Sequence, residues 1–169
     1  MRLAITFSLC ALLSVSPVLT AASVNAAEAA APIRAADSCS WSAEMEDDEG
    51  GPVMVASSCA SDAESGPAFR LMCGDQISIR YDGLGLGDNA PESGTMVLTS
   101  GGKSLDADVV LEEMDGALAA YVDMGSPVVA LFKTGSAIGV TFKGMSLPPR
   151  MVSLKGSSAA IDKLINACK

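Results

Sequence analysis

The sequence predicts an α+β fold, with a mainly antiparallel β-sheet of about seven short strands, a short mid-chain helix and a C-terminal helix, all held by disulfides. Three observations lead to this prediction. Apolar and polar residues alternate along most segments between residues 69 and 154, as half-solvated antiparallel strands require. After Gly156 the apolar residues take up helical spacing. The cysteines outside a predicted export signal are even in number, which indicates disulfides in an oxidising compartment.

Residues 1–26 are predicted to be a signal peptide. Arg2 supplies a positive start, a long apolar run follows, and small residues dominate as far as residue 31. Small residues at the third and first positions before the cut place cleavage after Ala26. Cleavage after Ala29 or Ser23 remains the alternative.

We expect residues 27–37 to form a disordered leader and residues 38–169 to form a single domain. The whole chain has 11 basic and 20 acidic residues, a net charge of −9, and loss of Arg2 with the signal peptide lowers this charge to −10. Such a surface repels nucleic acid and anionic lipid. We therefore expect a periplasmic or secreted monomer that binds no nucleic acid and has no stable membrane insertion after signal cleavage.

An acidic run near the start of the domain is interpreted as a solvated turn. Its carboxylates lack the alternating oxygens and the closing glutamate of an EF-hand loop, so we predict no metal site. The run consists of Glu44, Glu46, Asp47, Asp48 and Glu49.

Trp41 lies two residues after Cys39 and therefore on the same side of an extended strand, where we expect it to pack against a disulfide.

A β-hairpin is the first clear element. Alternating apolar residues from Phe69 to Cys73 and from Ile77 to Tyr81 predict its two strands, and Gly74-Asp75 fits a two-residue type II′ turn. Residues 57–66, rich in Ser, Ala, Asp and Gly, are predicted to form a loop. The glycine-rich stretch at 82–94 is also a predicted loop, because no helix follows it to make a phosphate-binding turn.

A meander of three strands follows the second loop. The predicted strands are Thr95–Thr99, Lys103–Glu112 and Ala117–Asp123, with turns at Gly101-Gly102 and Asp115-Gly116. Inward-facing positions are expected at Leu105, Ala107, Val109, Leu111, Leu118, Ala120 and Val122, with Asp106, Asp108 and Glu112 on the solvent side.

The segment from Ser126 to Thr134 is predicted to be a short helix. Ser126 fits an N-cap, Pro127 fits the first helical position and Gly135 fits the end. The β-branched pair that follows Pro127 leaves a strand as the alternative.

Two more strands and a helix complete the chain. The strands are Ile138–Phe142 and Met151–Leu154, and Ser157-Ser158 are interpreted as capping residues of the terminal helix. One apolar face of this helix carries Ile161, Leu164, Ile165 and Cys168 at positions i, i+3, i+4 and i+7.

The cysteines outside the signal peptide are Cys39, Cys59, Cys73 and Cys168, since Cys10 lies in its apolar run. Four cysteines allow three pairings. We favour Cys39–Cys59, which closes a local loop, and Cys73–Cys168, which joins a strand to the last helix; four free thiols are the alternative. The short closure is expected to stabilise by roughly 3 kcal/mol and the long one by about 4 to 5 kcal/mol.

No residue pattern points to catalysis. The chain has no histidine, which removes the commonest general base, most zinc sites and every Ser-His or Cys-His pair. Asp106 and Asp108 are two carboxylates at i and i+2, but no aromatic residue near them forms a cleft, so they are interpreted as a solvated face. We predict no enzyme activity, no cofactor and no metal.

Two C-terminal segments resemble the invasion-associated locus B family, small exported proteins of Gram-negative bacteria. They are Ser126–Lys143, with its capped apolar turn, Lys133-Thr134-Gly135 and alternating strand, and Ser153–Ile161, which reads Ser-Leu-Lys-Gly-Ser-Ser-Ala-Ala-Ile. The similarity covers about a third of the chain. It implies an envelope or virulence protein, with a binding role linked to host association or envelope integrity, an unidentified protein partner and no catalytic residues.

A second resemblance lies in Phe69–Tyr81, where an aromatic residue, Cys73, a tight glycine turn and an alternating strand precede a partner cysteine at the C-terminus. This pattern is similar to periplasmic inhibitors of C-type lysozyme, which is the alternative function. The resemblance implies that a serine and a lysine-bearing loop enter the lysozyme cleft. The candidates in this chain are Lys133, Ser136 and Lys143.

Overall fold

The computed structural model describes residues 40–48, 50–59, 67–82 and 91–168. Residues Ile33–Lys169 form one compact unit that contains all of them. The predicted signal peptide, the predicted leader, Cys39 and the middle part of both predicted loops lie outside the described residues.

The described residues form one antiparallel sheet and two helices, which confirms the predicted α+β class. The strand order across the nine-stranded sheet is β1-β2-β3-β4-β7-β6-β5-β8-β9. Its strands are β1 (Ser42–Asp48), β2 (Gly51–Ser57), β3 (Phe69–Cys73), β4 (Ile77–Tyr81), β5 (Ser93–Ser100), β6 (Lys103–Glu112), β7 (Ala117–Val122), β8 (Ala137–Lys143) and β9 (Arg150–Ser153). The helices are α1 (Pro127–Leu131) and α2 (Ser157–Ala167).

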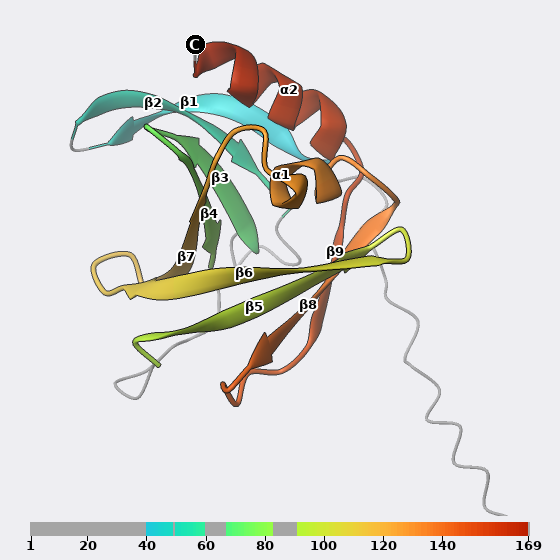
Figure 1. Cartoon of the computed structure of the whole chain (residues 1–169). Coiled ribbons are helices and arrows are strands. Elements are labelled where there is room, and N and C mark those ends of the chain that lie inside the picture. Colours follow the sequence, from blue (N-terminus) through green and yellow to red (C-terminus); the bar gives the residue numbers. More distant parts are fainter. Residues whose placement is uncertain (1–39, 49, 60–66, 83–90, 169) are drawn as a thin grey trace, which may run out of the picture. The chain divides into compact units, whose positions relative to one another are not determined.

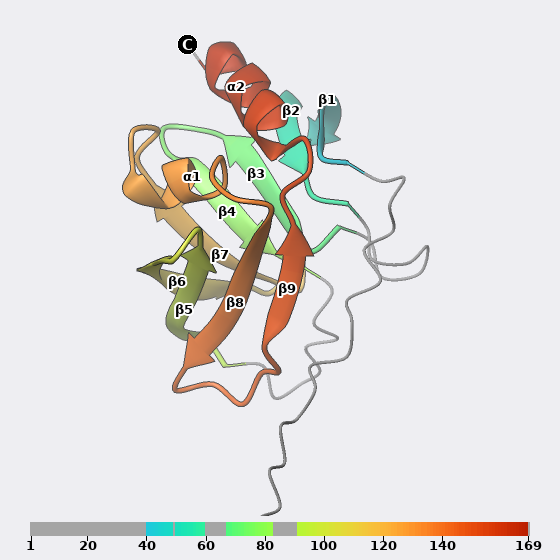
Figure 2. The same cartoon turned by 90° about the vertical axis from the view of Figure 1, so that its right-hand side faces the viewer.

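The sheet is strongly curved, and α2 lies along its β1–β2 hairpin (Figure 1). Helix α2 lies against β1, β2 and β3, and α1 contacts β5 and β6. Figure 2 shows β8 and β9 next to each other on the far side of the sheet from β1. The two ends of the sheet nevertheless meet, because the Trp41 amide before β1 donates to the Lys155 carbonyl after β9 at 2.9 Å. Trp41 Nε1 also donates to the Ser153 carbonyl oxygen at 2.7 Å.

Gly156, the residue that begins α2, makes this closure possible. It adopts φ +83°, a left-handed conformation that favours glycine. A Cβ at this position would also lie 3.2 Å from the Trp41 carbonyl oxygen and 3.2 Å from Ser40 Cβ. The start of β1 can therefore pass close to the start of α2 only where a side chain is missing.

Aromatic rings form the centre of the core. The Phe132 ring lies 4.9 Å from that of Phe69 and 5.9 Å from that of Trp41, in edge-to-face contact with both. Phe69 also contacts Tyr81 at 5.0 Å. The rings of Phe69, Tyr81 and Phe132 are completely buried. These aromatic side chains join β3, β4 and the residue before β1 to the C-terminal end of α1.

Both predicted helices are confirmed. Ser126 caps α1, accepting a hydrogen bond from the Val128 amide at 3.2 Å, and Pro127 begins the helix, so the strand alternative is wrong. On α2, Ile161 and Leu164 are fully buried. Ile165 and Cys168 on the same face are partly buried and pack against the core.

The predicted acidic turn is wrong, because four residues of the run, Glu44, Glu46, Asp47 and Asp48, lie in the edge strand β1, which pairs with β2. This hairpin accounts for the difference between about seven predicted strands and the nine in the described sheet. Within β1, Ala43 is buried between the exposed Ser42 and Glu44, but Met45 on the same face as Ala43 is exposed. The strand therefore shows only a short alternation, which its charges hid. Carboxylates on an edge strand also discourage pairing with another chain.

The turn of the β3–β4 hairpin differs from the prediction. Cys73 pairs with Ile77, so the loop has three residues, Gly74, Asp75 and Gln76. Gly74 has none of the positive φ that a type II′ turn requires at its first position.

Ser157 does not cap α2. Its hydroxyl is buried and contacts two carbonyl oxygens, those of Phe132 at 2.6 Å and Leu154 at 2.8 Å. The residue therefore joins the end of α1, the end of β9 and the start of α2.

Ser157→Ala is expected to destabilise the fold by about 1–3 kcal/mol, because it leaves the buried Phe132 carbonyl without its donor. The matched control is Ser158→Ala, a change one residue further along at an exposed position, for which we expect an effect within about 0.5 kcal/mol. Urea unfolding of the two variants measures the difference. Equal stability of both variants would contradict the bridging role of Ser157.

Candidate binding groove

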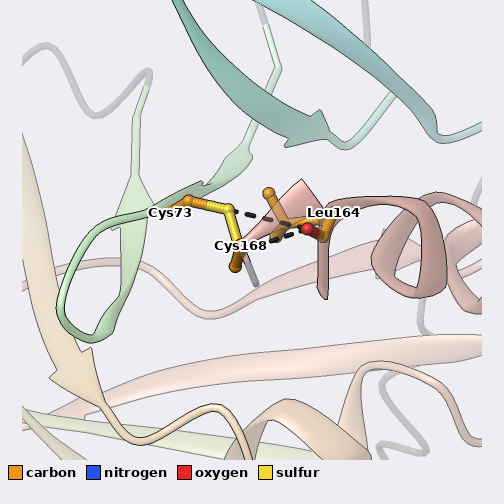
Figure 3. The surroundings of a disulfide bond; sticks show 3 residues. All are labelled: Cys73, Leu164 and Cys168. Carbon is orange, nitrogen blue, oxygen red and sulfur yellow. Dashed lines mark hydrogen bonds between the residues drawn. A yellow bond between two sulfur atoms is a disulfide. The ribbon is translucent and has the colours of Figure 1, made fainter. Parts of the chain in front are cut away.

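A disulfide between Cys73 and Cys168 lies beside the candidate binding site. Cys73 at the end of β3 and Cys168 after α2 form a disulfide with a Cα–Cα distance of 5.5 Å, which confirms the predicted pair. Both sulfur atoms lie near the Leu164 carbonyl oxygen, at 3.6 and 3.1 Å (Figure 3). Disulfide sulfurs carry no hydrogen, so these are contacts and not hydrogen bonds. Cys59 is also disulfide-bonded, and its predicted partner Cys39 lies outside the described residues.

The three residues predicted for lysozyme inhibition do not come together. Lys133 follows α1 and pairs with Asp162 of α2 at 2.5 Å, and Ser136 immediately precedes β8. Lys143 is the last residue of β8, where its ammonium pairs with Asp106 of β6 at 2.5 Å. The length of β8 separates Lys143 from Ser136 by about 20 Å.

A groove runs over the end of the sheet where β3, β4 and β7 lie side by side. It consists of two adjoining hollows with volumes of about 290 and 610 Å³ that share Gln76 and Tyr121. The smaller hollow is lined by Asp48, Met72, Asp75, Ser78 and Arg80, together with Cys73 and Gly74. The larger hollow is lined by Val122, Asp123, Gly125, Ser126 and Pro127. The disulfide at Cys73 therefore holds one wall of the groove to the last helix.

Tyr121 is the exposed aromatic residue of this groove. Its side chain belongs to the outer face of β7 and is 48% exposed. The hydroxyl donates to Glu112 Oε1 at 2.6 Å, and this bond, followed by partial burial and the charge of Glu112, raises the pKa of Tyr121. A ring fixed in this way presents a flat apolar surface to a ligand with little loss of side-chain entropy.

Polar groups surround this ring. Gln76 Nε2 donates to Asp123 Oδ1 at 3.4 Å across the boundary between the two hollows. The buried Ser78 Oγ and Arg80 Nε have no hydrogen-bond partner among the residues that the structure describes. Ser78 nevertheless lies near the Tyr121 hydroxyl and offsets part of the rise in the pKa of Tyr121. The groove thus combines an aromatic face with donors and acceptors, an arrangement typical of a binding site.

A charge cluster lies beside the groove. Arg70 and Arg80 face each other across β3 and β4; Arg70 pairs with Glu46 at 2.5 Å, and Arg80 pairs with Asp115. Burial raises the pKa of Asp82, and the charges of Arg70 and Arg80 offset part of this effect. Each arginine already has a carboxylate partner, so this cluster leaves little positive charge for an anionic ligand.

The described residues offer little else in the way of chemistry. Within them, His, Cys, Asp and Glu side chains do not gather in any group of three that suits a metal ion. None of the helices in the same ranges is both long and apolar enough to cross a membrane.

The groove residues were missed at the sequence level, although one signal was present. Leu118, Ala120 and Val122 define the inward face of β7, so the intervening Tyr121 had to face outward. An outward aromatic residue on a half-solvated strand is a reasonable indication of a binding surface. Its proximity to Gln76 could not be read from the sequence, because it depends on the pairing of β4 with β7.

Comparison of the chain with protein-family models, with curated proteins and with solved structures gave no match, so the likeness to known proteins rests on the sequence segments quoted above.

Proposed function

We propose that this protein is an exported, non-enzymatic binding module of the bacterial envelope, in the periplasm or secreted, with a role in host association or envelope integrity. The observation that carries the proposal is the groove around Tyr121, one wall of which is held by the Cys73–Cys168 disulfide. Structural disulfides persist in oxidising compartments and are rare in the cytosol. The envelope assignment itself is supported by the predicted signal peptide and by the resemblance to the invasion-associated locus B family.

The binding role is supported by what the groove offers. A partner would find a fixed aromatic ring, an amide and several carboxylates on neighbouring strands, which is a rigid platform that loses little entropy on binding. The proposed partner is a protein, because the groove is long and open rather than a closed cavity for a small molecule.

Inhibition of C-type lysozyme is the alternative. The acidic surface would steer the protein toward a basic enzyme. The inhibitory loop, however, needs Lys133, Ser136 and Lys143 to enter one cleft, and the length of β8 keeps Lys143 about 20 Å from Ser136. We therefore rank this alternative second.

Expression of the complete chain in a Gram-negative host tests the proposal. Intact mass spectrometry of the periplasmic fraction is expected to show loss of residues 1–26 and cysteines that resist alkylation without denaturant. The exported protein should not inhibit C-type lysozyme in a turbidity assay at low or high salt. A full-length mass with reactive thiols would contradict export, and salt-sensitive inhibition lost in Ser136→Ala or Lys143→Ala would favour the alternative.

A further inference from the structure

We propose that the groove binds an extended, positively charged peptide segment of a protein partner. This inference rests on the proposed function as a binding module and specifies the chemistry of its ligand. Three properties of the groove carry it: its charge, its length and its aromatic ring.

The charge of the groove favours a cation. Asp48 and Asp75 line the smaller hollow and Asp123 lines the larger one. Arg80 is the one cationic side chain among the described lining residues, and its charge is matched by Asp115. Asp123 accepts a hydrogen bond from Gln76, which is a neutral side chain and does not offset the carboxylate charge. A lysine or arginine of a ligand would meet carboxylates in both hollows, whereas an acidic ligand would be repelled.

The dimensions of the groove suit an extended chain. Asp48 belongs to β1 and Tyr121 to β7, and β2, β3 and β4 lie between these strands. Neighbouring strands lie about 4.8 Å apart, so the path along the curved sheet from Asp48 to Tyr121 is at most roughly 19 Å. An extended peptide advances about 3.3 Å per residue, and about six residues would therefore fill it. A basic residue of such a segment would meet Asp75 and Asp123 together, because Gln76, which follows Asp75, donates a hydrogen bond to Asp123.

Tyr121 gives this binding mode its central contact. The ring borders both hollows, and its hydroxyl is held by Glu112 at 2.6 Å. A lysine or arginine side chain that crosses the groove can place its aliphatic part or its charge against the ring face. Exposed aromatic residues of this kind often dominate the affinity of a peptide interface.

The test uses the oxidised protein purified after export and a blocked hexapeptide that alternates lysine and glycine. Amide NMR of the isotope-labelled protein locates the binding, and the shifts are expected at residues 74–76 and 121–126. The double variant Asp75→Asn/Asp123→Asn should weaken binding roughly three- to tenfold, because two charge contacts are lost. Its matched control is Asp106→Asn/Asp108→Asn, which removes the same charge from the solvent face of β6 and should leave the affinity unchanged.

Variants of the ring separate contact from charge. Tyr121→Ala should weaken binding of the hexapeptide, whereas Tyr121→Phe keeps the ring and should retain most of the affinity. Binding should also weaken as the salt concentration rises. The same peptide with glutamate in place of lysine, and a neutral chitin oligosaccharide, are the comparison ligands, and neither is expected to shift the groove amides.

Several results would overturn the inference. They are absence of binding by the lysine peptide, equal losses in the two double variants, or groove shifts with the sugar but not with the peptide. None of these results would affect the proposed assignment as an exported binding module, because export and oxidation are measured without the peptide. A cytoplasmic, reduced protein would overturn the proposed function even if the purified oxidised form bound the peptide.

Discussion

Phe132→Ala is expected to lower the free energy of unfolding by about 3–5 kcal/mol, one of the largest losses for any single substitution in this chain. Phe132 is completely buried and follows α1 as its C-cap residue. Its ring contacts that of Phe69 in β3 and that of Trp41 just before β1, so one side chain links these two parts of the chain. Removal of the ring leaves a cavity among rigid neighbours that cannot collapse to fill it.

Urea unfolding followed by tryptophan fluorescence measures this loss, because Trp41 is the single tryptophan and lies 5.9 Å from the Phe132 ring. Phe132→Leu fills most of the volume and should cost clearly less than the alanine variant. The neutral control is Met114→Ala, a change at a side chain that is 89% exposed. A loss below about 1 kcal/mol for Phe132→Ala would mean that the aromatic cluster is not the centre of the core.

Cys168→Ser is expected to destabilise the protein by about 4–5 kcal/mol, more than the roughly 3 kcal/mol for Cys39→Ser. The Cys73–Cys168 bond joins residues 95 apart in the sequence, and its loss restores most of the conformational freedom of the unfolded chain. The substitution also leaves a polar group on the half-buried face of α2. Cys73→Ser breaks the same bond and should give a similar loss.

Thermal unfolding of the three variants, with and without reductant, measures these effects. The difference between the wild-type protein and Cys168→Ser should largely disappear in reductant, because both then lack the bond. Equal midpoints for Cys168→Ser and Cys39→Ser in oxidising buffer would contradict the greater effect of the long closure. A large difference that persists in reductant would assign the loss to the serine side chain.

The predicted elements succeeded where apolar alternation was uninterrupted. From Phe69 to Tyr81 and from Lys103 to Val122, the residues predicted to face inward are buried or half-buried. The opposite face is also covered in places, since Met72, Ser78, Ala117 and Ala119 are buried. The cap at Ser126 and the proline after it likewise defined α1 from local chemistry alone.

Failures arose where tertiary contacts override local signals. The residues of β1 looked like a turn because four carboxylates mask its pattern, and the strand forms because β2 pairs with it along its whole length. Ser157 looked like a cap, yet its hydroxyl bonds to Phe132, a residue 25 positions away. The groove escaped prediction for the same reason: β4 and β7 are neighbours in the sheet, although β5 and β6 separate them in the sequence.

Site-specific photocrosslinking in living cells tests the central claim, that an exported binding module engages its partner through the groove. A photoreactive phenylalanine analogue replaces Tyr121 in the groove or, as the control, Met151 on β9, a side chain of similar exposure that does not line the groove. The account predicts a discrete protein adduct from position 121 in the periplasmic or secreted fraction and none from position 151. Adducts from position 151 alone, or no adduct from either position in correctly exported and oxidised protein, would contradict it.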